Sequence, residues 1–402
     1  MAGLSLSLLL VAGLLAWVVL DDDPYVATAP GDAARTAAPA LAGEALSGLE
    51  DAVLEGSPER AGDLADADDS AARDQLVALA ENAASAEVAE FSLRYVDELG
   101  GVAEDGTWQA AVDTSWAFRG FDPTPALAEV RFGFRVDGDR AVITSVGGGD
   151  RRSPLWMTTP LVVRRDAGTL VLVAGDAREA DRFESLAQAA VPAVHGVLPR
   201  WRPRLVVEVP PTLAALHGAL DSDPGQYDAV AAVTSTADGS LTPDGPVHVF
   251  VNPDVFGNLK PRGAQVVMSH EAVHVATDAA ISTMPLWLLE GFADYVALRD
   301  VHLPVSVTAG QIIGQVRADG PPAQLPGQAE FDTATAHLGA SYESAWLACR
   351  LLADVGGQTG LVDFYRAVDA GAEVDAALRS EFGFGERELT SRWQALLEDL
   401  AG

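Results

Sequence analysis

The sequence predicts an α+β protein with an apolar N-terminal helix, a small antiparallel-sheet domain, and a larger domain whose small sheet is followed by helices. Three observations support this fold class. Residues 2–20 carry no charged side chain. Strand-like segments flank turn residues at 137–138 and at 166–168, which indicates two β-hairpins. After residue 253 the apolar residues recur with a helical period, and this pattern continues nearly to the end of the chain.

The N-terminal segment, residues 1–20, is long enough to cross a bilayer once as a helix. Its uncharged run exceeds the ~7–15-residue core of a cleaved secretory signal, and no clear small-x-small cleavage site follows closely. Three aspartates at 21–23 favour export of the remainder. We therefore expect an uncleaved membrane anchor in preference to a cleaved leader.

Two segments of different texture follow the predicted anchor. Residues 21–72 are rich in Ala, Asp, Gly and Pro and hold few large apolar side chains, which is typical of a tether. Short helical pieces are expected around 44–54. Residues 73–176 show one helical stretch and then strand pairs. This order resembles the nuclear-transport-factor-2-like (NTF2-like) or cystatin-like superfold, which implies a curved sheet that holds a ligand or mediates packing.

The remaining residues, 177–402, predict a second α+β domain. A helix begins near 177, and a strand, a short helix and two further strands precede residue 253. The strand at 247–252 is interpreted as the edge of a substrate cleft or as an ordinary core strand. The segment 318–330, rich in Gly, Pro and Gln, is either a mobile flap or a connection.

The composition excludes several classes of partner and structure. The chain has 402 residues and a formal net charge of -32, from 26 basic and 58 acidic side chains. Such a charge repels phosphate backbones, so we expect no nucleic-acid partner. The single cysteine, Cys349, cannot form an internal disulfide, and its apolar neighbours favour core packing over a reactive thiol.

A pair of histidines carries the first chemical signal. The segment from His270 through Glu271 to His274 has the HExxH pattern in a chain with only 7 histidines. Residues four apart lie on one face of a helix, so both imidazoles can bind one ion. Glu271 lies about 100° further round the helix, where it can reach a water without being a ligand.

A second segment supplies the missing ligand. Glu290 lies on a predicted helix that begins after Pro285, and Asp294 follows one turn later. A catalytic zinc ion takes three protein ligands, and Glu290 completes such a set with one ion per chain. Asp294 can then accept the second N–H of a ligand histidine, which fixes the tautomer of that ring.

These two segments resemble the gluzincin metallopeptidases, in particular their peptidase-MA-like branch. "SHEAVHVATD" resembles the thermolysin active-site helix, and "PLWLLEGFADY" resembles the W-L-x-E-G-x-A segment of aminopeptidase N-type enzymes. The resemblance implies that His270, His274 and Glu290 are zinc ligands, that Glu271 is the general base, and that Asp294 orients a ligand histidine. Related enzymes bind the oxyanion with a downstream Tyr or His, for which Tyr342 is the first choice here and His337 the second.

The sequence differs from the two enzyme types named above in two respects. Fifteen residues separate His274 from Glu290, fewer than in the two enzyme types, so this connection must turn tightly. No G-x-M-E-N-type segment precedes the first motif, which argues against aminopeptidase activity. The apolar residues around Glu290 are interpreted as core rather than as a specificity pocket: Trp287, Leu288, Leu289, Phe292 and Tyr295.

The sequence therefore predicts a zinc peptidase that acts on polypeptides. Its expected location is the cell membrane, attached through the N-terminal helix as a single-pass protein with an extracytoplasmic catalytic domain, or alternatively the secreted fraction. A second hypothesis is a catalytically silent binding or scaffold protein with a metallopeptidase-like domain. A third is that the 73–176 domain restrains the peptidase. The oligomeric state is not predicted.

Overall fold

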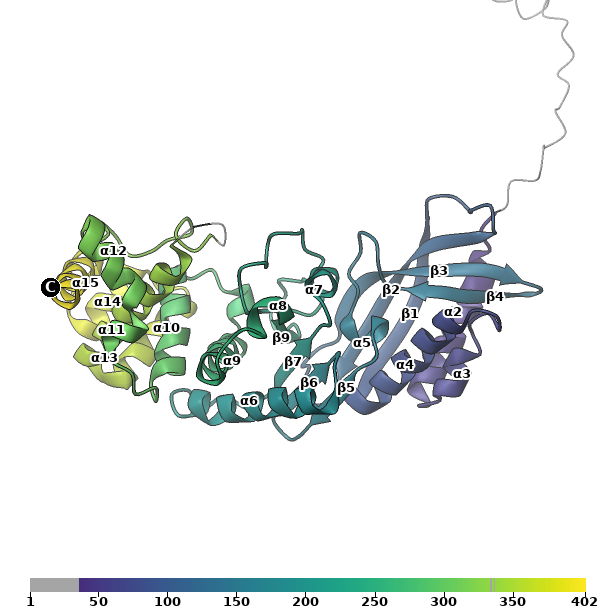
Figure 1. Cartoon of the computed structure of the whole chain (residues 1–402), viewed down its shortest axis with the longest axis horizontal. Helices are drawn as coiled ribbons and strands as arrows, with labels where there is room; N and C mark the ends of the chain where they lie inside the picture. The colour runs from purple at the N-terminus through teal and green to yellow at the C-terminus, as the bar shows by residue number, and fades with distance from the viewer. Residues whose placement is uncertain (1–35, 333–334, 336) are drawn as a thin grey trace, which may run out of the picture. The chain divides into compact units, whose positions relative to one another are not determined.

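The computed structural model describes residues 36–332, 335 and 337–402 (Figure 1). Residues 37–402 form one compact α+β unit that contains two sheets. The predicted membrane anchor, residues 1–20, lies outside the described residues. None of the helices in the described ranges is long and apolar enough to cross a bilayer. The predicted fold class is therefore corrected to α+β with two sheets, and the described helices do not support the predicted transmembrane helix, the membrane attachment or the single-pass extracytoplasmic location.

The first sheet has four antiparallel strands in the order β1-β2-β3-β4. Three helices precede it in the chain: α2 and α4 pack against the sheet, and α3 packs on these two helices. These elements are α2 (Pro39–Leu54), α3 (Pro58–Gly62), α4 (Ser70–Ala86), β1 (Val88–Leu99), β2 (Thr107–Phe118), β3 (Ala126–Asp137) and β4 (Arg140–Val146). The sequence-predicted hairpin at 137–138 is the β3–β4 pair.

The helix α2 lies where short helical pieces are expected, around 44–54, but it corrects the prediction that this part of the chain belongs to a tether. Ala42, Leu46 and Leu49 recur with a helical spacing and are completely or almost completely buried. The many alanines of this segment let the helix approach the sheet closely, so a composition that resembles a linker forms part of a core. Folded structure therefore begins well before residue 73.

The second sheet has five strands in the order β5-β6-β7-β9-β8. β6, β7 and β9 are parallel, and β5 and β8 run antiparallel to them at the two edges. The short helix α5 precedes this sheet in the chain, and four helices, α6 to α9, lie between or after its strands. The elements are α5 (Leu155–Thr158), β5 (Val162–Arg165), β6 (Thr169–Val173), α6 (Ala177–His195), β7 (Leu205–Val209), α7 (Leu213–Leu220), β8 (Ala232–Thr236), β9 (Val247–Val251), α8 (Pro253–Phe256) and α9 (Pro261–Ala276).

The β5–β6 hairpin differs from its predicted place. The sequence assigned residues 73–176 to one sheet domain, but β6 pairs in parallel with β7 of the second sheet. All five residues of β6 are buried, which is the pattern of a strand covered on both faces. Leu170 and Leu172 pack in the same core as the first sheet, whereas Val171 and Val173 pack with α6. The hairpin therefore joins the two cores.

A buried histidine also lies between the two sheets. His248 on β9 is 0% exposed, and its Nδ1 lies 2.7 Å from Oε1 of Glu208 on β7. Its Nε2 lies 2.9 Å from Oδ1 of Asp122, in the connection between β2 and β3. Burial opposes protonation of this ring, but the two carboxylates outweigh it and raise the pKa of His248 to about 10. An imidazolium ion therefore links the first sheet to the second.

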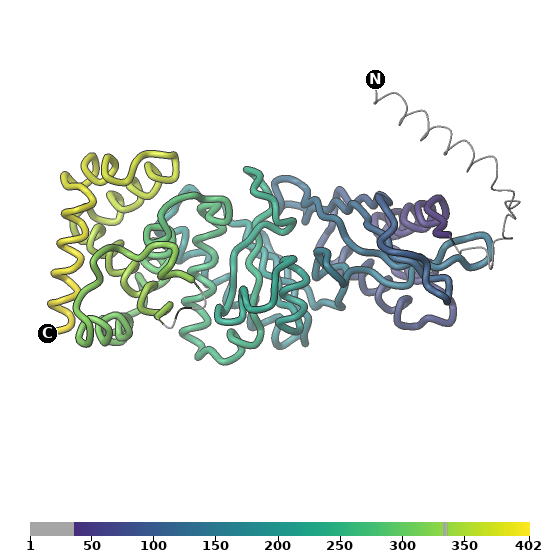
Figure 2. The backbone as a smooth tube through the Cα atoms, turned by 90° about the horizontal axis from the view of Figure 1, so that it is seen from above, coloured from purple at the N-terminus to yellow at the C-terminus, as the bar shows by residue number. Residues whose placement is uncertain are grey.

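The C-terminal part consists of helices that pack on α9 and on one another (Figure 2). It contains η1 (Ala279–Ile281), α10 (Leu286–Leu298), α11 (Val305–Thr308), α12 (Gly310–Asp319), α13 (Leu338–Asp369), α14 (Val374–Phe382) and α15 (Glu386–Ala401). α13 is kinked at Gly357, whose φ of 70° is in the left-handed region. Cys349 on α13 is fully buried, and burial raises the pKa of its thiol well above its ordinary value. This matches the predicted core role.

Candidate metal centre

The helix α9 presents the HExxH residues at the boundary between the sheet and the C-terminal helices. It begins with Pro261, whose fixed φ suits the first turn of a helix. Seven consecutive residues, 268–274, are buried, because α9 packs against the sheet, α6 and α10. His270 and His274 therefore lie one turn apart on a helix with little freedom to move.

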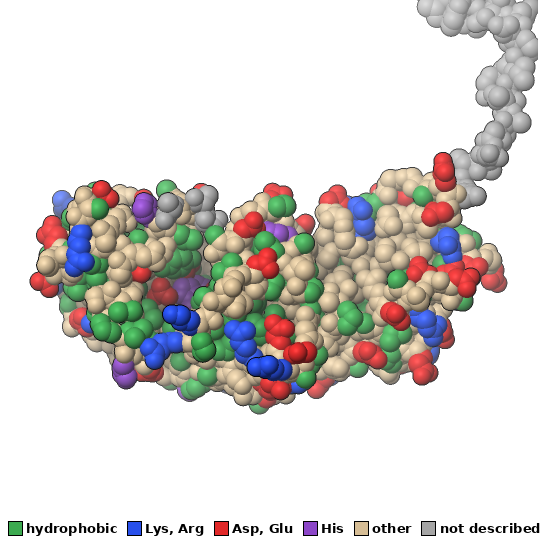
Figure 3. All heavy atoms as spheres, viewed as in Figure 1, with side chains coloured by type: hydrophobic (Ala, Val, Ile, Leu, Met, Phe, Trp, Pro, Cys, Tyr) green, Lys and Arg blue, Asp and Glu red, His purple; other side chains and the backbone are tan. Residues whose placement is uncertain are grey.

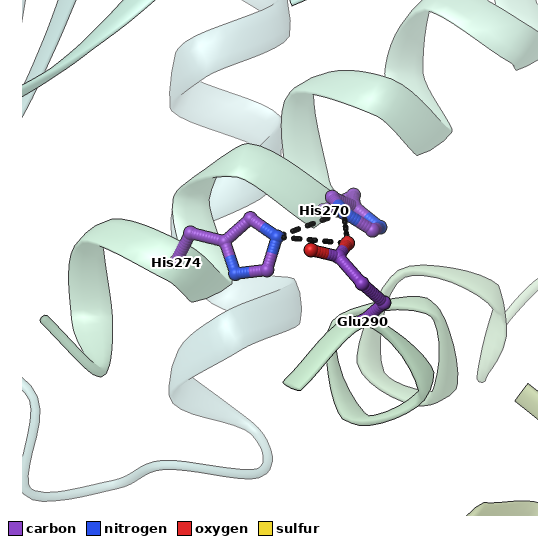
Figure 4. A group of neighbouring side chains, drawn as sticks. All are labelled: His270, His274 and Glu290. Atoms are coloured by element: carbon purple, nitrogen blue, oxygen red, sulfur yellow. Dashed lines mark hydrogen bonds and ion pairs between the residues drawn. The ribbon is translucent and has the colours of Figure 1, made fainter. Parts of the chain in front are cut away.

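The connection from α9 to α10 makes the tight turn that the short spacing requires. Asp278 adopts a left-handed conformation with φ of 50°, η1 follows, and Pro285 precedes the first residue of α10. Pro285 cannot continue the preceding backbone into the helix, so α10 starts in a new direction. This change of direction brings Glu290 to face the two histidines (Figure 4).

Gly291 sets how closely α10 approaches α13. A Cβ at this position would lie 2.4 Å from the carbonyl oxygen of Ala345 and 2.9 Å from Sγ of Cys349. Only a glycine permits this approach of the two helices. The residue next to Glu290 thus fixes the depth of α10, and with it the position of the carboxylate.

The three side chains converge on one point (Figure 4). Oε2 of Glu290 lies 3.1 Å from Nε2 of His270 and 3.3 Å from Nε2 of His274, and the two Nε2 atoms are 2.9 Å apart. Among the described residues, these three side chains form the group of His, Cys, Asp or Glu residues that could hold a metal ion. The sequence-predicted ligand set is therefore brought together in space.

Asp294 lies where the sequence predicts an orienting carboxylate. Its Oδ1 accepts a hydrogen bond of 2.8 Å from Nδ1 of His270, one turn of α10 beyond Glu290. In the neutral ring, this hydrogen bond places the proton on Nδ1 and leaves the lone pair of Nε2 facing the convergence point.

The electrostatics of the cluster favour positive charge at the same point. Burial opposes protonation of His270, but Asp294 and Glu290 outweigh it and hold the pKa of the ring well above its ordinary value. Burial also disfavours ionisation of Glu290, but His274 and His270 outweigh it and hold the pKa of this carboxyl far below its ordinary value. The two carboxylates therefore favour positive charge on and between the two rings.

Tyr342 on α13 lies close to His270 of the cluster. Its ring lies 6.0 Å from the ring of His270, centre to centre. Burial, with the nearby carboxylates of Glu290 and Glu271, raises the pKa of Tyr342, so its hydroxyl keeps its proton at neutral pH. His337, the second choice from the sequence, lines a different cavity from the one that contains the histidine pair. The structure therefore brings Tyr342, and not His337, to the site.

The cluster opens on a cleft made of two adjoining cavities. One has a volume of about 510 Å³ and the other of about 280 Å³, and His270, Glu271 and Tyr342 line both. Figure 3 shows a recess with histidine and acidic side chains at its floor and hydrophobic side chains around it. Small and aliphatic residues line the larger cavity, including Ala231, Ala232, Val266, Val267 and Leu338.

The strand that borders the cleft is β8, and not the strand at 247–252 that the sequence suggested. That segment contains β9, which is internal because it pairs with both β7 and β8. Among the strands that the structure describes, β8 has a neighbour on one side only. Ala237 donates its N–H to Pro246, and Asn252 donates its N–H to Ala231, so the odd-numbered residues of β8 bond to β9. The backbone groups of Ala232 and Thr234 therefore point outward.

The general-base candidate, Glu271, faces the cleft from α9. Glu271 is 6% exposed, and Oε2 of its carboxylate accepts a hydrogen bond of 2.7 Å from the hydroxyl of Thr234. The sequence analysis did not identify Thr234 or Gly291. A glycine inside an apolar helix is a signal for close packing that the sequence contains, whereas the contact of Thr234 depends on strand order.

The predicted core residues next to Glu290 are distributed as follows. Trp287, Leu288 and Phe292 are buried, and Leu289 is buried but also lines the smaller cavity. Tyr295 is partly buried and lines a separate cavity further along α10. The wall of the site is thus mostly dry and rigid, as a metal centre requires.

Comparison with known proteins gives no assignment. No protein-family model matches this chain, and no curated protein matches it.

Proposed function

We propose that this chain is a zinc-dependent peptidase of the gluzincin type that hydrolyses peptide bonds in polypeptide substrates. The observation that carries the proposal is the convergence of His270, His274 and Glu290 at the floor of a cleft, with Glu271 beside them. The resemblance of the two motifs to gluzincin peptidases agrees with it.

The donor set fits a zinc ion. Two imidazole nitrogens and one carboxylate oxygen are the ligands of a catalytic zinc site, which leaves a fourth position open. Ligands about 2.0–2.1 Å from the ion in a tetrahedron lie about 3.3–3.4 Å apart. The donor atoms here lie 2.9, 3.1 and 3.3 Å from one another, so small movements would complete the geometry.

The protein side chains divide the work of hydrolysis. Zinc held by these residues would supply a Lewis acid beside the substrate carbonyl and the attacking water. Glu271 takes the proton of that water and delivers it to the leaving amine. The protonated hydroxyl of Tyr342 donates a hydrogen bond to the oxyanion that develops on the carbonyl.

An extended peptide suits the cleft. The outward backbone groups of Ala232 and Thr234 can pair with a substrate as an added strand. The aliphatic lining of the larger cavity favours an apolar substrate side chain on that side of the cleaved bond. The open edge of β8 favours a peptide over a small-molecule substrate.

The test compares wild type with Glu271→Gln. Metal analysis should give about one zinc per chain in both proteins. The wild type should cleave members of an unbiased peptide library and lose this activity to a chelator, whereas the variant should lose on the order of 10³-fold or more in turnover. Zinc-loaded wild type that cleaves no peptide in the library would overturn the proposal and favour a silent binding module.

A further inference from the structure

Thr234 lies where the strand that borders the cleft meets the general base. Its backbone groups point away from β9, toward the space where an added strand would lie. Its side chain points to the α9 face of the sheet and donates to Oε2 of Glu271 at 2.7 Å. The same hydroxyl lies 3.2 Å from the main-chain oxygen of Glu271, so it is held against the first turn of the motif.

The hydroxyl of Thr234 leaves one carboxylate oxygen of Glu271 for proton transfer. Among the described residues, the Thr234 hydroxyl is the group that donates a hydrogen bond to the Glu271 carboxylate. Both residues line the smaller cavity with His270, His274 and Glu290. A carboxylate anchored through one oxygen presents the other in a fixed direction, which is the alignment that proton transfer needs.

We propose that Thr234 is a positioning residue that orients Glu271 and links substrate binding along β8 to alignment of the base. This inference rests on the proposed peptidase function. Thr234 touches no metal donor at hydrogen-bond distance, so its loss should affect turnover and leave metal binding unchanged. A bound peptide that pairs with the backbone of Thr234 would also restrain the strand that carries this hydroxyl.

Three variants separate positioning from a structural role. Thr234→Val removes the hydroxyl and keeps the shape, and Thr234→Ser keeps the hydroxyl. Thr236→Val is the matched control, because Thr236 lies two residues along the same face of β8 and donates instead to the carbonyl of Ser240. Each protein is assayed for zinc content, thermal unfolding, kcat and KM on one cleaved peptide.

We expect Thr234→Val to lower kcat by about 10- to 100-fold, as loss of a hydrogen bond to a charged group implies, with KM within about twofold. Thr234→Ser should recover most of kcat, and Thr236→Val should stay near wild type. Wild-type kcat in Thr234→Val, or no recovery in Thr234→Ser, would overturn this role while the peptidase stands. Zinc-loaded wild type without activity would overturn the peptidase proposal and this role together.

Discussion

Two buried histidines in this protein lie between carboxylates, and only one belongs to a group that could hold a metal ion. His248 contacts Glu208 and Asp122 at 2.7 and 2.9 Å. His270 contacts Asp294 and Glu290 at 2.8 and 3.1 Å. Burial, distances and the raised pKa are similar in the two clusters.

The difference lies in direction and access. In both clusters the two carboxylates contact opposite nitrogens of the ring, but the side chains of His248, Asp122 and Glu208 are almost fully buried, and no further metal donor among the described residues joins them. At His270, the Nε2 atom of His274 joins the group, three donors face one point, and that point opens on a cleft. Convergence of donors next to a cavity, rather than charge pairing alone, therefore distinguishes a candidate metal centre from a structural ion cluster.

The largest expected contrast is in zinc affinity. His274→Ala removes one of the three proposed zinc ligands and should weaken zinc binding on the order of 10³-fold, about 4 kcal/mol. His248→Gln should leave the affinity within about twofold, because no metal donor contacts that ring. Competition with a chromogenic chelator measures both. Equal losses in the two variants would show that the two clusters are not functionally distinct.

Stability should respond in the opposite order. His248→Gln leaves the carboxylates of Asp122 and Glu208 buried without their cation, which should lower the free energy of unfolding by about 3 kcal/mol. His274→Ala, measured in the same urea titration with a chelator present, should cost less, since its ring borders the cleft. A His248→Gln protein as stable as wild type would show that His248 does not stabilise the junction between the two sheets.

The pH dependence of that difference has a defined sign. Because folding raises the pKa of His248 from 6.5 to about 10, the imidazolium contribution is complete below pH 6.5. It declines as the pH rises and is lost above about pH 10. The stability gap between wild type and His248→Gln should therefore narrow over this interval.

The smallest effect is expected at Asp294. Asp294→Asn keeps an oxygen acceptor but removes the charge that supports His270, so zinc affinity should fall about 10-fold. Asp300→Asn is the matched control, since Asp300 is an exposed partner of Arg299 near the end of the same helix. An unchanged affinity in Asp294→Asn, measured by the same competition, would mean that the His270–Asp294 hydrogen bond does not tune the site.

The sequence was sufficient to predict the group that could hold a metal ion, because the geometry of this group is mostly local. His270 and His274 are related by one helical turn, and Glu290 follows in a motif with recognisable apolar spacing. The contact between Thr234 and Glu271 could not be read in this way, because it depends on which strand forms the sheet edge. His248 was missed for the same reason, since its partners lie 40 and 126 residues away in the chain.

Large-scale organisation was less predictable than the site. The segment 39–54 has the composition of a tether, but its few leucines repeat with helical spacing and become core. The β5–β6 hairpin was assigned to the wrong sheet because a parallel partner cannot be identified from an apolar run alone. The apolar N-terminal run, 1–20, gave the membrane expectation that the described helices do not support.

The shared hairpin has a practical consequence for dissecting the protein. Expression of residues 177–402 alone would discard β5 and β6, leave the edge of β7 without its neighbour, and expose Val206 and the side of α6 that contacts β5 and β6 to water. A bare strand of this kind invites aggregation. Any fragment meant to carry the histidine pair in soluble form must therefore start upstream of Val162 and retain Asp122 or a substitute for its charge.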